Sequence, residues 1–236
     1  MTWSIIAKDP ETGSFGVAVT TKFFAVGALC PHGTARIGAL ATQALVNPLY
    51  GTDGMRFLAE GRSAEEIVAV LTAQDPGRES RQLHVIDRDG RTAAHTGREC
   101  IDWCGHLTDD GVSVAGNMLA GPTVIEATLE TYKRRMDLPF ADRLLTALDA
   151  GQTEGGDKRG KQSAALKVWR DEPYSMLDLR VDDHAEPIVE LQRLYRTSLE
   201  RYQPFMACLA GRHDPVSVID RAEIEARVAR FHAAPR

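Results

Sequence analysis

Runs of apolar residues predict the strands of this chain. Residues 2–7 and 14–21 are rich in apolar and β-branched residues, and the turn residues Pro10 and Gly13 lie between them, so the chain should begin with a β-hairpin. The stretch TARIGALATQALV, residues 34–46, has apolar residues at both odd and even positions, which is typical of a strand covered on both faces. Further strands are predicted over residues 81–87, 91–97, 111–119, 163–169 and 176–183.

Helical periodicity separates these strands. Ser63 is a good N-cap for the helix SAEEIVAVLTAQ, and Pro122 stands at an early position of the helix that continues as TVIEATLETYKRRM. Gly151 should end a helix that begins with FADRLL. Helices are also predicted near residues 47–61 and over residues 187–202. Short turns favour antiparallel neighbours, so the order indicates an α+β fold with sheets between helical layers.

Length and composition suit one enzyme-sized domain. The chain has 236 residues, and its hydrophobic and charged fractions, 43% and 26%, are those of a globular protein. We expect a single domain over residues 1–204. A helical extension over residues 205–236 should pack on the body or on a partner subunit.

Charge and hydropathy indicate which partners and which cellular compartment to expect. A net charge of -5, spread along the chain, does not provide the basic surface that nucleic acid requires. There is no apolar run of about 18 residues and no signal-peptide pattern, so we expect a cytoplasmic protein that does not bind membranes. The four cysteines have no disulfide-framework spacing and should be reduced.

One short segment of the sequence, residues 95–106, gives a weak indication of metal binding. His95, Cys100, Cys104 and His106 lie close together in the sequence, but paired Cys-x-x-Cys units are missing. We therefore expect no metal and no other cofactor.

Thr2 is the first candidate for chemistry. Removal of Met1 would leave Thr2 with a hydroxyl and a free α-amino group, a nucleophile that carries its own base. The alternative is that threonine is merely tolerated at the second position. Ser4 lies two residues further on, so strand alternation puts it on the same face as Thr2. Ser4 is the rival nucleophile, although it would need a separate base, or it hydrogen-bonds the true nucleophile.

Two further residues could assist acyl transfer. Asn117 lies where a predicted strand gives way to a helix, so its amide or the adjacent backbone N–H groups could stabilise an oxyanion. Lys22 follows the second strand, where a cation could lower the pKa of the terminal amine. The alternatives are a turn asparagine with capping bonds and a solvent-facing lysine.

Substrate contacts are predicted at two places. Gln43 and Asn47 are amides beside an apolar strand and could bind a substrate amide or carboxylate, or could satisfy loop backbone. The glycine-rich loop GDKRGKQS supplies a second set of polar groups, in which a lysine or arginine could hold an anion, although a solvated surface loop is the alternative. The candidates in this loop are Asp157, Lys158, Arg159 and Gln162. The spacing is not that of a Walker phosphate-binding loop.

Several spaced motifs resemble one family. The segments TWSIIAKDPETGSFGVAV, ATQALVNPLYG, DPGRESRQ, GNMLAGP, GDKRGKQSAAL and LRVDDHAEPI occur in this order, and together they resemble the DUF1028 family over about residues 2–195. The resemblance implies the four-layer αββα fold of the N-terminal nucleophile hydrolases. Many of those enzymes carry an acidic residue where this chain reads TTKFF, so a proteasome-like charge network is not expected here.

The sequence thus leads to two hypotheses. The first is an amidohydrolase that cleaves an amide or ureido C–N bond of a small polar or anionic metabolite. In it Thr2 attacks, Asn117 stabilises the oxyanion, and Lys158 and Arg159 supply positive charge. The second is a non-catalytic module that binds a small molecule or a protein in the same cleft. In either case we expect a homodimer or larger homo-oligomer.

Overall fold

The computed structural model describes residues 2–233. The chain divides into two compact units, of which the first ends at Leu191 and the second begins at Gln192. The predicted division at residue 204 stays a prediction. No helix within the described residues is both long and apolar enough to cross a membrane.

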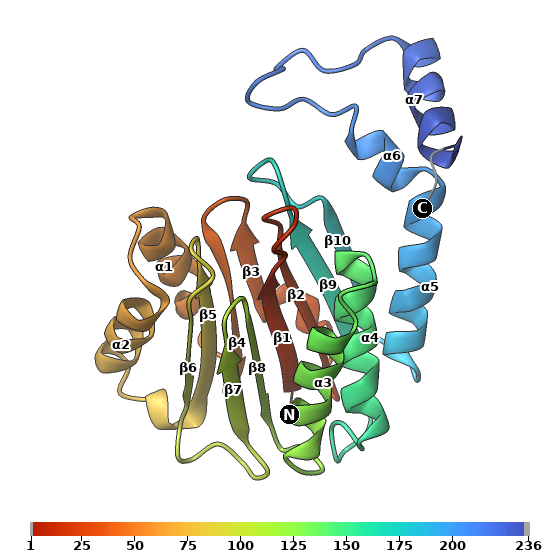
Figure 1. Cartoon of the computed structure of the whole chain (residues 1–236). Helices are drawn as coiled ribbons and strands as arrows, with labels where there is room; N and C mark the ends of the chain where they lie inside the picture. The colour runs from red at the N-terminus through yellow and green to blue at the C-terminus, as the bar shows by residue number, and fades with distance from the viewer. Residues whose placement is uncertain (1, 234–236) are drawn as a thin grey trace. The chain divides into compact units, whose positions relative to one another are not determined.

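Two antiparallel sheets form the first unit (Figure 1). The six-stranded sheet has the order β10 (Leu177–Val181), β9 (Ser163–Trp169), β2 (Phe15–Thr21), β1 (Thr2–Lys8), β8 (Val112–Asn117) and β7 (Gly105–Asp109). The four-stranded sheet has the order β3 (Pro31–Thr34), β4 (Gly38–Ala44), β5 (Arg81–Asp87) and β6 (Thr92–Thr96). The predicted β-hairpin of β1 and β2 is confirmed, and it lies at the centre of the larger sheet.

Helices cover the outer face of each sheet. Helices α1 (Pro48–Ala59) and α2 (Ala64–Gln74) pack on β4, β5 and β6, whereas α3 (Thr123–Arg134) and α4 (Phe140–Thr153) pack on the larger sheet. The inner faces meet through β1 against β4 and β5 against β8. The predicted α+β fold, with two antiparallel sheets between helical layers, is confirmed.

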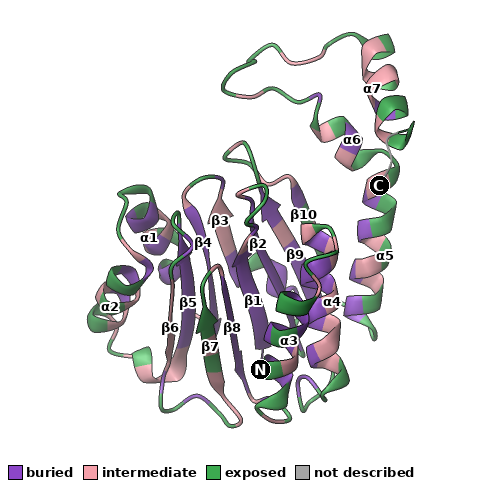
Figure 2. Cartoon of the chain, viewed as in Figure 1, coloured by how far each residue is buried: buried purple, intermediate pink, exposed green. Residues whose placement is uncertain are grey.

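Alternation along β1 divides its side chains between two layers. Ile6 joins the core between the sheets, with Val17 and Val19 of β2 and Ala41 of β4, whereas Trp3 faces the helical layer near Gly151 of α4. The strand is buried from its first residue, as Figure 2 shows for the centre of the sheet. Thr2, the first residue of this buried strand, therefore lies in the protein interior.

Two predicted boundaries are wrong. The strand predicted over residues 34–46 is shorter in the structure, where β4 spans Gly38–Ala44, because Arg36 (φ 63°) and Gly38 (φ 148°) adopt backbone angles that turn the chain between β3 and β4. Gly151 does not end its helix, since α4 continues to Thr153. A Cβ at Gly151 would lie 2.3 Å from the Thr128 hydroxyl, so this glycine permits close packing of α3 against α4.

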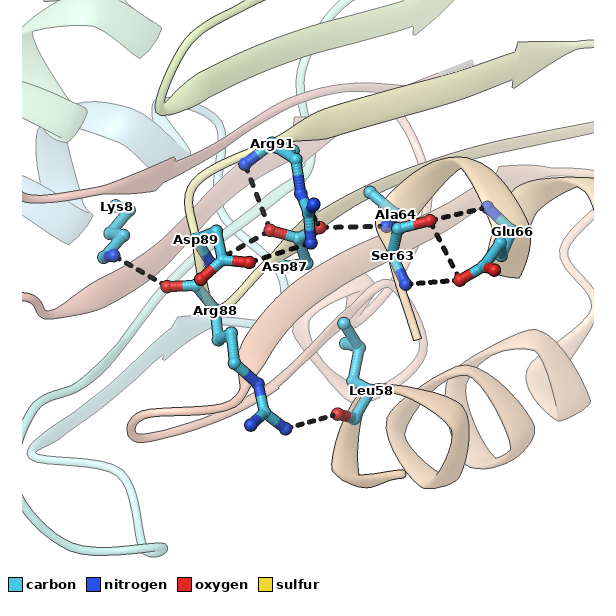
Figure 3. A network of polar contacts seen from close by, with 9 residues as sticks. All are labelled: Lys8, Leu58, Ser63, Ala64, Glu66, Asp87, Arg88, Asp89 and Arg91. Atoms are coloured by element: carbon cyan, nitrogen blue, oxygen red, sulfur yellow. Dashed lines mark hydrogen bonds and ion pairs between the residues drawn. The ribbon is translucent and has the colours of Figure 1, made fainter. Parts of the chain in front are cut away.

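A polar network holds the far end of β5 (Figure 3). The buried carboxylate of Asp87 accepts hydrogen bonds from the backbone N–H groups of Ala64, Asp89 and Arg91, and it pairs with the Arg91 guanidinium at 2.9 Å. The Ala64 bond places a negative charge at the start of α2, where the helix dipole favours it. The Ser63 N-cap predicted for this helix is confirmed, and Glu66 completes it as a capping box.

The second unit is helical. It contains most of α5 (Pro187–Glu200), together with α6 (Tyr202–Met206) and α7 (Arg221–Ala233). Arg201, which precedes α6, pairs with Glu225 of α7, and His232 of α7 hydrogen-bonds to the Glu200 carbonyl. The packing of this extension on the body or on a second copy stays a prediction.

Candidate functional site

Thr2 begins β1 directly opposite Asn117, the last residue of β8. Its hydroxyl hydrogen-bonds to the Thr21 hydroxyl at the end of β2, with 3.1 Å between the oxygens, and the residue is 7% exposed. Met1 lies outside the described residues. Thr2 is therefore held on both sides by neighbouring strands and keeps a small exposed surface.

Two buried amides donate to the Thr2 carbonyl, and a third amide, Gln82, connects them. Gln43 Nε2 and Asn117 Nδ2 both donate to this oxygen at 3.4 Å. The same two nitrogens donate to Gln82 Oε1, at 2.7 Å and 3.1 Å respectively. Because an amide nitrogen has two hydrogens, Asn117 uses both in orienting Thr2 and in bonding Gln82. Its side-chain amide thus positions the start of β1.

Gln82 connects the two sheets at this point. It comes from β5 of the smaller sheet, and its Nε2 donates to the carbonyls of Gly105 and Gly116, on β7 and β8 of the larger sheet, and to Thr96 Oγ1. Sequence reasoning missed this residue. The available signal was a second polar residue, next to Arg81, at the start of the strand RQLHVID.

Ser4 is fully buried and belongs to a second polar cluster. Its hydroxyl donates to Gln43 Oε1 at 2.7 Å and hydrogen-bonds to His84 Nε2 at 2.8 Å. Since Ser4 gives its single proton to Gln43, His84 Nε2 must carry a hydrogen and donate, leaving Nδ1 to accept from Ser113. In this tautomer His84 cannot remove the Ser4 proton. Sequence reasoning also missed His84.

Burial sets the protonation state of the titratable groups behind Thr2. Desolvation lowers the pKa of His84 to about 3, so the imidazole is neutral at physiological pH. Desolvation also raises the pKa of the Cys30 thiol to about 12. The cluster behind Thr2 therefore carries no charge, and Cys30 is a poor nucleophile.

A cavity of about 370 Å³ opens in front of Thr2. Its polar lining consists of Thr2, Cys30, Thr42 and Gln43. Its apolar lining consists of Phe23, Val26, Leu29, Ala44, Leu45 and Val46. Arg81 and Arg159 complete the wall. The volume lies within the range of small-molecule sites.

Each arginine of the cavity is held by a carboxylate. Arg81 Nε lies 3.3 Å from Asp75 Oδ2, and its Nη1 donates to the Leu45 carbonyl. Arg159 Nη2 lies 3.2 Å from Asp157 Oδ2. Asp157 is buried and also accepts from the backbone N–H groups of Lys22 and Arg159. The glycine-rich loop thus brings a buried acid to the end of β2, where the local sequence TTKFF has none.

Four other predicted site residues lie outside the described lining of the cavity, although the Asn47 amide donates to Asp75, which holds Arg81. The Lys22 ammonium donates to the Lys161 carbonyl, and the Lys158 ammonium donates to the Asp102 carbonyl. Asn47 caps α1 through the Leu49 N–H, and Gln162 donates to the Asp183 carboxylate. Their roles stay predictions, although the cavity lining of the described residues includes none of these four side chains.

The histidine and cysteine side chains between residues 95 and 106, which were considered as metal ligands, form ordinary hydrogen bonds. His95 bonds to the Arg78 carbonyl, His106 to the Thr96 hydroxyl, and the Cys104 thiol to the Cys100 carbonyl. Within residues 2–233, no three histidine, cysteine or acidic side chains converge as a metal site would require. All four cysteines are free thiols.

Comparison with known proteins assigns the family. The chain belongs to DUF1028, a family of unknown function, whose model matches residues 2–191. It is similar to the crystal structure of protein SPO2555 from Silicibacter pomeroyi, also matched to DUF1028, with 34% identity and a TM-score of 0.85. The similarity covers 93% of this chain and 99% of that chain. No curated protein matches.

Proposed function

We propose that this protein is an amidohydrolase that uses Thr2 as an N-terminal nucleophile to cleave a C–N bond of a small molecule. The observation that carries the proposal is the position of Thr2, which begins a central buried strand and lines a cavity of about 370 Å³. Clamping of its carbonyl by Gln43 and Asn117 supports the proposal, because a nucleophile needs a fixed orientation. The resemblance to the four-layer N-terminal nucleophile hydrolases supports it as well.

The chemistry follows from a threonine with a free amine. Thr2 Oγ1 attacks the substrate carbonyl carbon while the α-amino group accepts the hydroxyl proton. The tetrahedral intermediate then collapses as the same group returns a proton to the leaving nitrogen, so that the C–N bond breaks and an ester on Thr2 remains. Water hydrolyses this ester and restores the hydroxyl. The proposal therefore requires that Thr2 be the first residue of the mature chain.

The neighbouring residues take supporting roles in this proposal. Asn117 is a positioning residue, because its two amide hydrogens are directed at the Thr2 carbonyl and at Gln82 Oε1. Gln43 is a second one, since its Nε2 shares two hydrogens among the carbonyls of Thr2 and Ala115 and Gln82 Oε1. Arg159 and Arg81 supply positive charge at the cavity in place of the Lys158 and Arg159 pair expected from the sequence. Burial and its bond to Gln43 make Ser4 part of the supporting cluster.

Covalent labelling tests the nucleophile. Intact mass should show that Met1 is absent, and a β-lactone probe should add one acyl group, which peptide mapping places on Thr2. The adduct should be lost in Thr2→Ala and retained in Ser4→Ala. Retention of Met1 in the fully active protein, or unchanged labelling of Thr2→Ala, would refute the proposal.

Turnover is measured with a panel of amide and ureido compounds, with release of ammonia or amine as the signal. We expect Thr2→Ala to lower kcat by at least about 10²-fold for any compound that is cleaved, because removal of a nucleophile abolishes the covalent route. Leu49→Ser, which alters an exposed side chain outside the cavity lining and outside the candidate site residues, is the control. Full turnover by Thr2→Ala would contradict the assigned role.

A second function is a non-catalytic binding module. The observation that favours it is the largely apolar cavity wall, which resembles that of a small-molecule binding site. This function predicts ligand-dependent thermal stabilisation with no turnover in the same panel. The homodimer and the cytoplasmic location stay predictions, and sedimentation and cell fractionation measure them.

A further inference from the structure

We propose that the cavity in front of Thr2 binds a carboxylate-bearing amide with one apolar arm, such as an N-acyl amino acid. This inference rests on the proposed function for the amide, whereas the carboxylate and the apolar arm follow from the cavity lining.

The apolar arm follows from the wall of the cavity. Phe23 and Leu45 are 57% and 66% exposed although both line it, and Leu29 is 38% exposed. Large apolar side chains gathered around a concave surface favour a ligand that removes them from water. A wholly polar metabolite would leave this part of the wall uncovered.

The carboxylate follows from the charges. Two guanidinium groups line the cavity, and among its described lining residues there is no aspartate or glutamate. Asp75 and Asp157 contact these guanidinium groups, and the Asp157 side chain is 1% exposed. The ion pairs hold the planar groups in place. A fixed guanidinium favours a carboxylate, which it can bind through two parallel hydrogen bonds.

The volume limits the size of the ligand. A cavity of about 370 Å³ lies near the lower end of the range for small-molecule sites. This suffices for an amide, a carboxylate and one aryl or short alkyl group. A long peptide or a polymer would have to extend outside the cavity.

Binding to Thr2→Ala tests the ligand class without turnover. The probes are hippurate (N-benzoylglycine), its amide benzoylglycinamide, which lacks the charge, and N-acetylglycine, which lacks the aryl arm. Calorimetry should give a Kd for hippurate at least about tenfold lower than for either relative. Equal affinity for hippurate and benzoylglycinamide, equal affinity for hippurate and N-acetylglycine, or no binding at millimolar concentration, would overturn the inference.

Matched variants in the Thr2→Ala background locate the two groups. Arg159→Gln should weaken hippurate at least about tenfold and leave benzoylglycinamide unchanged, while Leu45→Ser should weaken both. The controls are Arg78→Gln and Leu49→Ser, which alter an exposed arginine and an exposed leucine outside the cavity lining and should change neither Kd. Melting temperatures verify that each variant is folded. Equal weakening by a variant and its control would overturn the inference.

The two proposals fail separately. Hippurate bound with this selectivity but not hydrolysed by the protein with Thr2 intact supports the ligand class and counts against the proposed function. Hydrolysis of amides that lack both the carboxylate and the apolar arm, at equal kcat/KM, supports the proposed function and overturns this inference.

Discussion

Replacement of Gln82 by methionine should destabilise the protein strongly. Methionine has nearly the same shape as glutamine, so the change removes the polar contacts of Gln82 Oε1 and Nε2 with little change in volume. Gln43 Nε2 keeps the Ala115 and Thr2 carbonyls as acceptors, whereas Asn117 keeps only the Thr2 carbonyl and loses the acceptor of its other amide hydrogen. The Gly105 and Gly116 carbonyls lose the bond that Gln82 Nε2 donates.

The magnitude follows from the carbonyls. A buried polar group left without its partner costs about 1–3 kcal/mol, so the two carbonyls together should lower the free energy of unfolding by about 3 kcal/mol. In a chain of this length that corresponds to a fall in Tm of roughly 6–12 °C. The assay is urea and thermal unfolding followed by circular dichroism.

The control and a second measurement separate folding from function. Gln162→Met removes a surface bond to Asp183 and should change stability by less than about 0.5 kcal/mol. Gln82→Met should also slow β-lactone labelling of Thr2 at temperatures where the variant is folded, because Gln43 and Asn117 lose their common acceptor. A Gln82→Met variant within about 1 kcal/mol of the parent would refute the view that this amide joins the two sheets.

Three other predictions concern buried titratable groups. The folded-state pKa of His84 lies below its usual value, so the unfolded chain binds the extra proton; stability should fall as pH decreases from about 6.5 towards 3, by up to about 1.4 kcal/mol per pH unit. Urea titrations at several pH values should show that the free energy of unfolding falls less steeply with decreasing pH in His84→Gln than in the parent. An equally steep fall in both proteins would contradict this prediction. Arg143→Met should lower the free energy of unfolding by about 3–5 kcal/mol, because it leaves the Asp9 carboxylate of a buried ion pair uncompensated. Arg135→Met, which removes the partner of Asp137 in an exposed ion pair, should lower it by less than about 1 kcal/mol in the same assay. Cys30 should resist iodoacetamide at pH 7.5 although it lines the cavity, and labelling of Cys30 before Cys104 in peptide maps would refute this.

Local chemistry accounts for the parts of the fold that the sequence predicted well. The β1–β2 hairpin and the Ser63 N-cap depend on residues close together in the chain. The strand predicted over residues 34–46 is present as β4, but its predicted start was wrong because the apolar pattern continued through the turn before Gly38. The β7 strand, Gly105–Asp109, was missed because its residues are partly exposed and lack a strong apolar pattern.

In the candidate site, too, the sequence predicted some residues and missed others. Thr2, Asn117 and Gln43 were identified from the sequence, and the structure brings them into contact. Gln82 and Arg81 were missed, because their proximity to Thr2 depends on the packing of one sheet on the other.

The sequence by itself indicated the family, through a resemblance of spaced motifs. It also determined the α+β class, the early strand that begins at Thr2, and the placement of Thr2 and Ser4 on one face, which follow from periodicity and from local residue chemistry. Only the tertiary structure decided that Ser4 is buried against His84, and that Asp157 provides the acid that TTKFF lacks. It also decided that Arg81 and Arg159, rather than Lys158, line the cavity. Residues far apart in the chain make these contacts, so their geometry arises only when the two sheets and the glycine-rich loop pack together.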